Sequence, residues 1–177
     1  MKIKHLFSVL LVLVFGTFTS CELFEKVDDV TFNVVLPLDF GINEEAENPG
    51  GMSYFDEALL DANSNADIAK YASKIKEFKI DKITYAISDA DPTTVIFTNG
   101  SLVVASTGKT IATESSASLA NTAETDLTAN IDGFNDLAAR LLDDKQELVQ
   151  LNGTFSQTPV AFNVRFRFYV KVTANAL

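Results

Sequence analysis

The sequence has very few of the residues that most catalytic and metal sites require. It contains one cysteine, one histidine and no tryptophan, and the two single residues, Cys21 and His5, lie within the first 21 positions. Zinc and copper sites, Ser-His-Asp triads and Cys-His nucleophile pairs depend on these side chains. Residues 22–177 therefore lack the means for most hydrolase and redox designs, and the chain cannot form an internal disulfide. We expect no enzyme activity and no cofactor.

Basic residues are also scarce. The chain has 14 Lys and Arg against 24 Asp and Glu, a formal net charge of −10. Phosphate binding requires clustered Lys and Arg, so we expect no nucleic-acid partner. Oxygen-based chemistry stays open, because a carboxylate pair for glycoside cleavage or a calcium site needs only Asp, Glu and Asn.

The first 20 residues have the pattern of a removable signal. A basic start, Lys2 to His5, is followed by the apolar run Leu6–Phe15 and by small and hydroxyl residues up to Ser20. This order is typical of a secretory signal peptide. The apolar stretch, which ends at Phe18, is shorter than the roughly 20 residues that a membrane-spanning helix needs. We therefore predict a signal peptide over residues 1–20.

The segment Phe18-Thr19-Ser20-Cys21 resembles the lipobox of bacterial lipoproteins, which signal peptidase II cuts before the cysteine. The resemblance implies that Cys21 carries fatty acid such as palmitate and becomes the new N-terminus. It also implies an outer-membrane lipoprotein of a Gram-negative bacterium, anchored through its N-terminal lipid. The alternatives are an ordinary secretory signal with a leftover thiol, and a buried structural cysteine.

Processing would leave an acidic protein on a short acidic tether, residues 21–29. Cleavage removes Lys2 and Lys4, which leaves 12 of the 14 basic residues against all 24 acidic ones. Acidic tethers stay solvated and repel anionic headgroups. The tether fits display on the cell surface and attachment on the periplasmic face equally well.

Residues 30–177 are predicted to form one domain rich in strands. Residues 30–40 and 160–173 alternate apolar and polar side chains, which predicts two strands. Pro37 places the first strand at a sheet edge or a bend. The second is long enough to bend or to cross between two sheets, and it should line the core.

Other segments are expected to turn or to form short helices. Asn99-Gly100 between two β-branched runs predicts a hairpin turn, and the slip in the pattern between Ile80 and Ile83 predicts a bulge. We expect a solvated loop over 41–51, one or two weak strands over 110–130 and a short helix over 132–142. Residues 52–77 are ambiguous, because their spacing fits a short helix over 52–59 and a second over 65–75. The predicted fold is mainly β, an antiparallel β-sandwich with one or two short helices. The order of elements resembles the sandwich of late-embryogenesis-abundant, water-stress-type domains.

A candidate metal site lies at Asp61, Asn63, Asn65 and Asp67, which place an oxygen ligand at every second position. This spacing is typical of a calcium loop, but alanines stand where the loop needs its glycine and its bidentate glutamate. We interpret the segment as a polar turn that caps the next helix. A nonstandard calcium site is the alternative.

A candidate ligand-binding stripe lies on the last strand, where Arg165, Arg167, Tyr169 and Lys171 project from one face. One interpretation is a site for an anionic partner, such as a carboxylate-bearing glycan. The other is that these side chains pair with acids on neighbouring strands.

The sequence therefore favours a lipid-anchored envelope lipoprotein that acts as a noncatalytic binding or assembly module, with an envelope protein or a glycan as its partner. A carrier of a hydrophobic ligand in a β-sandwich cavity is one alternative. A carboxylate-based glycan hydrolase is another, for which the sequence nominates no catalytic residue.

Overall fold

The computed structural model describes residues 29–176, which form a β-sandwich of two antiparallel sheets. Sheet A contains, in spatial order, β1 (Asp29–Asn48), β9 (Thr158–Asn175), β3 (Ile75–Asp91) and β6 (Thr125–Asp126). Sheet B contains β2 (Met52–Asp61), β8 (Gln146–Phe155), β4 (Ile96–Val104), β5 (Thr110–Ser118) and β7 (Thr128–Ala129). The helices are the 3-10 turn η1 (Ala62–Ser64), α3 (Ala66–Tyr71) and α4 (Ile131–Asp144). The predicted fold class is confirmed.

β9 lies between β1 and β3 and organises sheet A. Its apolar side chains at alternate positions are buried, and its polar ones face outward. The inner face packs on sheet B through aromatic contacts such as Phe155 to Phe162, whose ring centroids lie 5.9 Å apart in an edge arrangement. β9 stays in sheet A over its whole length instead of crossing to sheet B. β1, with Pro37, is an edge strand of sheet A, as predicted.

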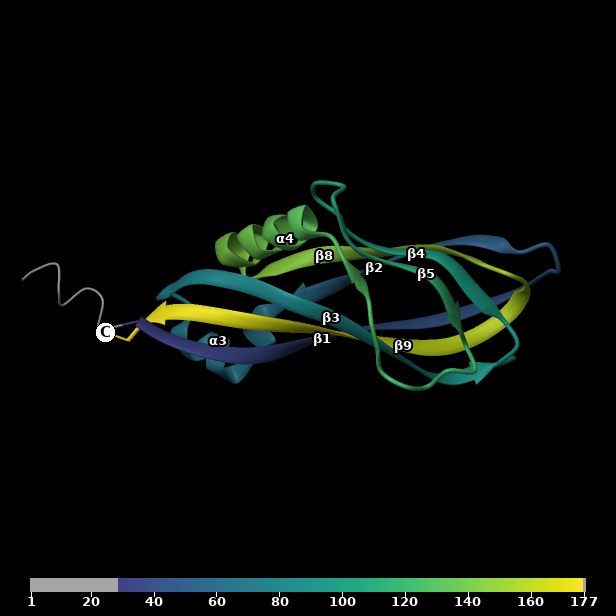
Figure 1. Ribbon diagram of the computed structural model, residues 1–177, viewed down its shortest axis with the longest axis horizontal. Coiled ribbons are helices and arrows are strands. Elements are labelled where there is room, and N and C mark those ends of the chain that lie inside the picture. The colour runs from purple at the N-terminus through teal and green to yellow at the C-terminus, as the bar shows by residue number, and fades with distance from the viewer. Residues whose placement is uncertain (1–28, 177) are drawn as a thin grey trace, which may run out of the picture.

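α4 fills the space beside the strands with one apolar face. Phe134, Leu137 and Leu141 are buried on it, and Asn130 caps its N-terminus by accepting hydrogen bonds from two backbone N–H groups. Gly133 allows the helix to approach β5, because a Cβ there would lie 1.9 Å from the Thr110 carbonyl oxygen. Figure 1 shows α4 and α3 on opposite sides of the strands, near the end where β1 begins and β9 ends.

Two predictions for residues 41–61 were wrong. The expected loop over 41–51 is mostly strand, because β1 continues to Asn48 and buries Ile42 opposite Phe162. The expected helix over 52–59 is β2, which pairs with β8 along ten residues. Tyr54, Phe55, Ala58 and Leu59 satisfied a helical spacing. Pairing with β8 instead turns Tyr54, Ala58 and Leu60 inward and leaves Phe55 and Leu59 exposed by 59% and 50%.

The Asn99-Gly100 hairpin prediction was also wrong. Both residues lie inside β4, where Asn99 has a φ of 52° and the register with β8 shifts between Thr98 and Ser101. Asn and Gly tolerate a positive φ, and a bulge can require this conformation as well as a hairpin turn. The chain turns later, at Gly108, whose φ is 73°. The bulge predicted near Ile80 is confirmed, because the β3 register shifts between Ile80 and Lys82.

The segment between β5 and α4 crosses from one sheet to the other. β6 pairs with β3, β7 pairs with β5, and the N–H of Leu127 donates to the Ile83 carbonyl at 3.0 Å. This crossing covers one side of the sandwich, and it carries acidic residues to the outer face of sheet A.

Both ends of the described chain lie at one end of the molecule. Asp29 pairs with Asn175, while the β1–β2 turn lies at the opposite end (Figure 1). At about 3.3 Å per residue, a strand as long as β9 separates the two ends by roughly 60 Å. Among residues 29–176, no helix is long and apolar enough to span a bilayer.

Candidate functional site

The polar side chains of β9 form one continuous surface, which we call the β9 outer face: Asn163, Arg165, Arg167, Tyr169 and Lys171. They share this face because their neighbours in the strand are buried between the sheets. All four residues of the predicted ligand-binding stripe are therefore brought together.

Arg165 is paired with a carboxylate on the edge strand. Asp39 lies directly opposite it on β1, and the guanidinium donates from Nε to Oδ1 at 2.6 Å and from Nη2 to Oδ2 at 2.9 Å. This two-bond geometry is the strong form of an Arg–carboxylate contact. The hydrogen bonds from Arg165, with its charge, hold the pKa of Asp39 below its usual value.

Arg167 and Tyr169 share a second carboxylate, Glu124, which the crossing segment supplies. Glu124 Oε1 accepts from Tyr169 at 2.9 Å and from Thr84 Oγ1 at 2.5 Å, and Oε2 accepts from Arg167 Nη1 at 3.0 Å. The hydrogen bonds from Thr84 and Tyr169, with the nearby Arg167 charge, lower the pKa of Glu124. Both arginines therefore pair with acids. Asp39 lies on a neighbouring strand, as the second interpretation predicted, whereas Glu124 lies just before β6. Lys171 lies opposite Asn33 and Lys79.

Small side chains beside β9 leave a hollow on this face. Gly41 and Ser88 flank Asn163, and Ala86 lies opposite Arg165, around a hollow of about 450 Å³. A second hollow of about 340 Å³ lies farther along the same face, lined by Asn33, Val35, Asp81, Lys82 and Tyr169. Both hollows open to solvent on the outer face of sheet A, so a ligand there would lie across the strands and would not be enclosed.

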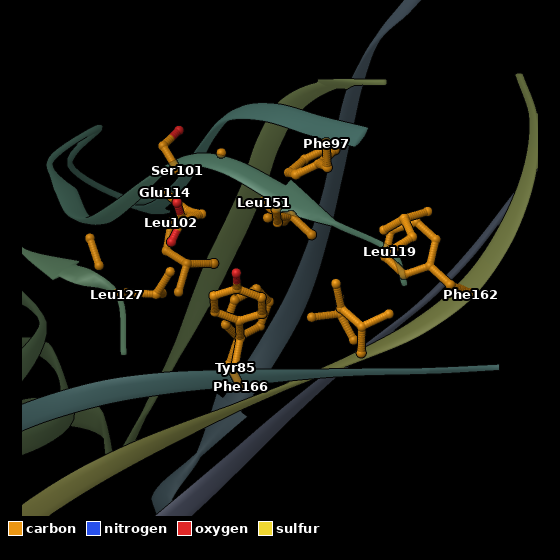
Figure 2. Close-up of a pocket in the computed structure, with 15 residues that line it drawn as sticks. Tyr85, Phe97, Ser101, Leu102, Glu114, Leu119, Leu127, Leu151, Phe162 and Phe166 are labelled. Atoms are coloured by element: carbon orange, nitrogen blue, oxygen red, sulfur yellow. The ribbon is translucent and has the colours of Figure 1, made fainter. Parts of the chain in front are cut away.

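The sandwich interior holds a much smaller cavity (Figure 2). Its volume is about 40 Å³, and it exists because the small residues Gly100, Ala112 and Ala117 face aromatic side chains of sheet A. Figure 2 shows the Tyr85 hydroxyl directed toward Glu114 and Leu102 across this space. Burial raises the pKa of Tyr85, and the nearby charge of Glu114 adds to this effect.

The residues of the predicted calcium loop cap helices. Asp61 accepts a hydrogen bond from the backbone N–H of Asn63 at the start of η1, and Asn65 accepts from Asp67 and Ile68 at the start of α3. This agrees with the capping interpretation. Within residues 29–176, no three His, Cys, Asp or Glu side chains converge as a metal site would require. Cys21, the predicted lipidation site, lies outside the described residues.

Sequence reasoning missed Asp39 and Glu124. Asp39 was visible as an outward residue of the first strand, but nothing local linked it to Arg165, 126 positions away. Glu124 lies in a Ser/Thr/Ala-rich stretch with no strong periodicity. Cross-strand pairing of arginines with carboxylates is favourable, but the sequence does not say which of the many acids form these pairs.

Comparison with known proteins gives no family for this chain. No protein-family model matches it, and no curated protein is similar to it. Among solved structures, a chain of Desmodium yellow mottle tymovirus is 12% identical and covers 84% of this chain and 89% of its own, with a TM-score of 0.45. The BFDV capsid protein, from a decameric crystal structure, is 9% identical and covers 81% and 99%, with a TM-score of 0.47.

Proposed function

We propose that this protein is a lipid-anchored cell-envelope lipoprotein that binds a partner noncatalytically through the β9 outer face. The observation that carries the binding half is the pair of hollows along that face, lined by fixed hydrogen-bonding side chains. The anchoring half rests on the lipobox-like segment that ends at Cys21.

Two observations argue against the alternatives, a hydrophobic-ligand carrier and a glycan hydrolase. The interior cavity, at about 40 Å³, has room for one or two water molecules and not for an acyl chain, so the carrier hypothesis gains no support from it. A glycan hydrolase requires one carboxyl group that stays protonated as the general acid. Asp39 and Glu124, the carboxylates beside β9, both have lowered pKa values and are ionised at neutral pH.

Fatty-acid labelling tests the anchor. The full chain, expressed in a Gram-negative host with labelled palmitate, should incorporate the label and lose residues 1–20. Cys21→Ser should incorporate none and should keep the signal. Equal labelling of both proteins would overturn the lipoprotein assignment.

An epitope at the far end of the molecule tests which membrane face is used. A tag after Leu177 would lie at the end that holds Asp29, because β9 ends beside the start of β1. A tag inserted at the exposed Gly50 in the β1–β2 turn lies at the opposite end. Cleavage of this tag by protease on intact cells indicates surface display, whereas protection until the outer membrane is opened indicates the periplasmic face.

Site-specific photo-cross-linking tests the binding half. A photoreactive residue at Ser88 lies in the first hollow, while the same residue at exposed Ser106 lies in the β4–β5 turn of sheet B. We expect a slower-migrating adduct in cells from Ser88 and none from Ser106. The binding half fails if Ser88 gives no adduct, or if both positions give the same one.

A further inference from the structure

We propose that the partner of the β9 outer face is a neutral, hydroxyl-rich glycan chain. This proposal rests on the proposed function and names the class of ligand that the same face accepts.

Charge pairing argues against an anionic ligand. Arg165 is neutralised by Asp39, with Nε to Oδ1 at 2.6 Å, and Arg167 by Glu124, with Nη1 to Oε2 at 3.0 Å. At the first hollow, which both arginines line, an anion would have to break one of these pairs or approach beside a carboxylate, on a chain of net charge −10. Like-charge contacts of this kind reduce affinity.

The paired groups instead suit hydroxyls. A hydroxyl both donates and accepts, an arginine offers five N–H donors, and a carboxylate offers about four acceptor positions. The Arg165–Asp39 pair uses two of those donors on one another and presents the remaining donors and acceptors side by side. Ser88, and Asn163, whose Nδ2 donates to Asp89 at 3.0 Å, add further fixed polar groups.

The geometry suits an extended chain more than a single small molecule. Asn163 and Tyr169 lie six residues apart on β9, which separates them by about 20 Å. The hollows of about 450 and 340 Å³ follow one another along this strand, the first lined by Asn163, Arg165 and Arg167 and the second by Tyr169. Near the second hollow, Val35 is 41% exposed. Val35 therefore offers apolar surface to the C–H face of a sugar, beside the Tyr169 ring, whose centroid lies 4.6 Å from the Lys82 ammonium.

A polysaccharide binding panel tests the proposal. The full chain in detergent is immobilised and exposed to neutral glucan, mannan, galactan, xylan and arabinan, and to acidic alginate and polygalacturonate. We expect saturable binding to at least one neutral polymer, with a Kd that changes less than about twofold between low and high salt, because no counterions are released.

A substitution that fills the hollow gives the matched control. Ala86→Tyr places a ring in the first hollow without changing charge. Thr113→Tyr also adds a ring without changing charge, but at an exposed position of β5 in the other sheet. We expect Ala86→Tyr to weaken binding about tenfold or more, which corresponds to about 1.4 kcal/mol, and Thr113→Tyr to leave it unchanged. Equal unfolding midpoints for the two variants ensure that the loss is not one of folding.

Two results would overturn the glycan proposal. One is binding only to acidic polymers, with affinity that falls steeply as salt is added. The other is no binding to any neutral polymer while cross-linking at Ser88 still yields its adduct in cells. In that second case the binding function stands and only the ligand class is wrong.

Discussion

Gly153 on β8 has no side chain because the ring of Phe97 occupies the space that a Cβ would fill. A Cβ built there lies 2.0 Å from the Phe97 ring, while at Gly50 the nearest atom is 3.5 Å away. Phe97 in turn contacts Phe155, with ring centroids 5.0 Å apart, in the part of the core that joins the two sheets. The absence of a side chain at Gly153 therefore allows Phe97 to pack against Phe155.

We predict that Gly153→Ala lowers the free energy of unfolding by about 1–3 kcal/mol, because the Phe97 ring must leave its position beside Phe155. Gly50→Ala should change it by less than about 0.5 kcal/mol. Urea denaturation of both variants measures the difference. Adding Phe97→Leu should recover part of the loss in Gly153→Ala, and the steric explanation is wrong if it recovers none.

At the scale of elements, α4 is tied to the β4–β5 turn by one carboxylate. Asp136 accepts from Thr107 Oγ1 at 2.6 Å and pairs with Lys109 Nζ at 3.0 Å. The hydrogen bond from Thr107, followed by the interactions with Lys109, lowers the pKa of Asp136. A folded-state pKa below the unfolded value means that the ionised group stabilises the fold at neutral pH. This stabilisation is complete above the ordinary aspartate pKa of about 3.9 and is lost as the pH falls through the lower folded value.

We predict that Asp136→Asn lowers the free energy of unfolding at neutral pH by about 1 kcal/mol or less, since solvent screens the pair. The difference between variant and wild type should shrink as the pH falls toward about 3. Urea denaturation over this pH range measures it. Lys109→Gln should reproduce only part of the loss, because the Thr107 hydrogen bond remains. A gap that stays constant with pH would contradict the electrostatic origin.

At the scale of the whole molecule, acidic residues gather at the end opposite the chain termini. The end of β1 and the first half of β2 carry a group of exposed or half-exposed acids: Glu44, Glu45, Glu47, Asp56 and Glu57. Arg165, the nearest arginine on β9, is already paired with Asp39. Close like charges destabilise a compact state, and salt screens their repulsion.

We predict that added salt raises the thermal unfolding midpoint by a few degrees, as about 1 kcal/mol of relieved repulsion would do in a protein of this size. Replacing Glu44 and Glu45 by Gln should raise the midpoint at low salt and reduce its response to salt. Asp81→Asn is the control, because Asp81 pairs with Lys79 at 3.2 Å and its loss should not raise the midpoint. Calorimetry at low and high salt measures these midpoints. An unchanged salt response in the double variant would show that repulsion among these acids does not cause the effect of salt.

The sequence by itself predicted the elements in which one apolar periodicity continues over many residues. β9 and α4 were found because alternation over a long strand, and an apolar face over several helical turns, leave one consistent period. β2 was missed because Tyr54, Phe55, Ala58 and Leu59 fit one face of a helix, whereas in the strand only Tyr54 and Ala58 point inward. The sequence also predicted the β9 stripe, since outward and inward side chains must alternate in a strand.

Only the tertiary structure decided what those outward side chains contact. Asp39 and Arg165 are 126 residues apart, and Glu124 and Arg167 are 43 apart. Alternation fixes the face on which a side chain lies, because it is a local property of the backbone. The partner across the sheet depends on strand order and register, which are set by the burial of the whole core. The same burial left small residues beside β9, and so formed the hollows from which we infer the ligand.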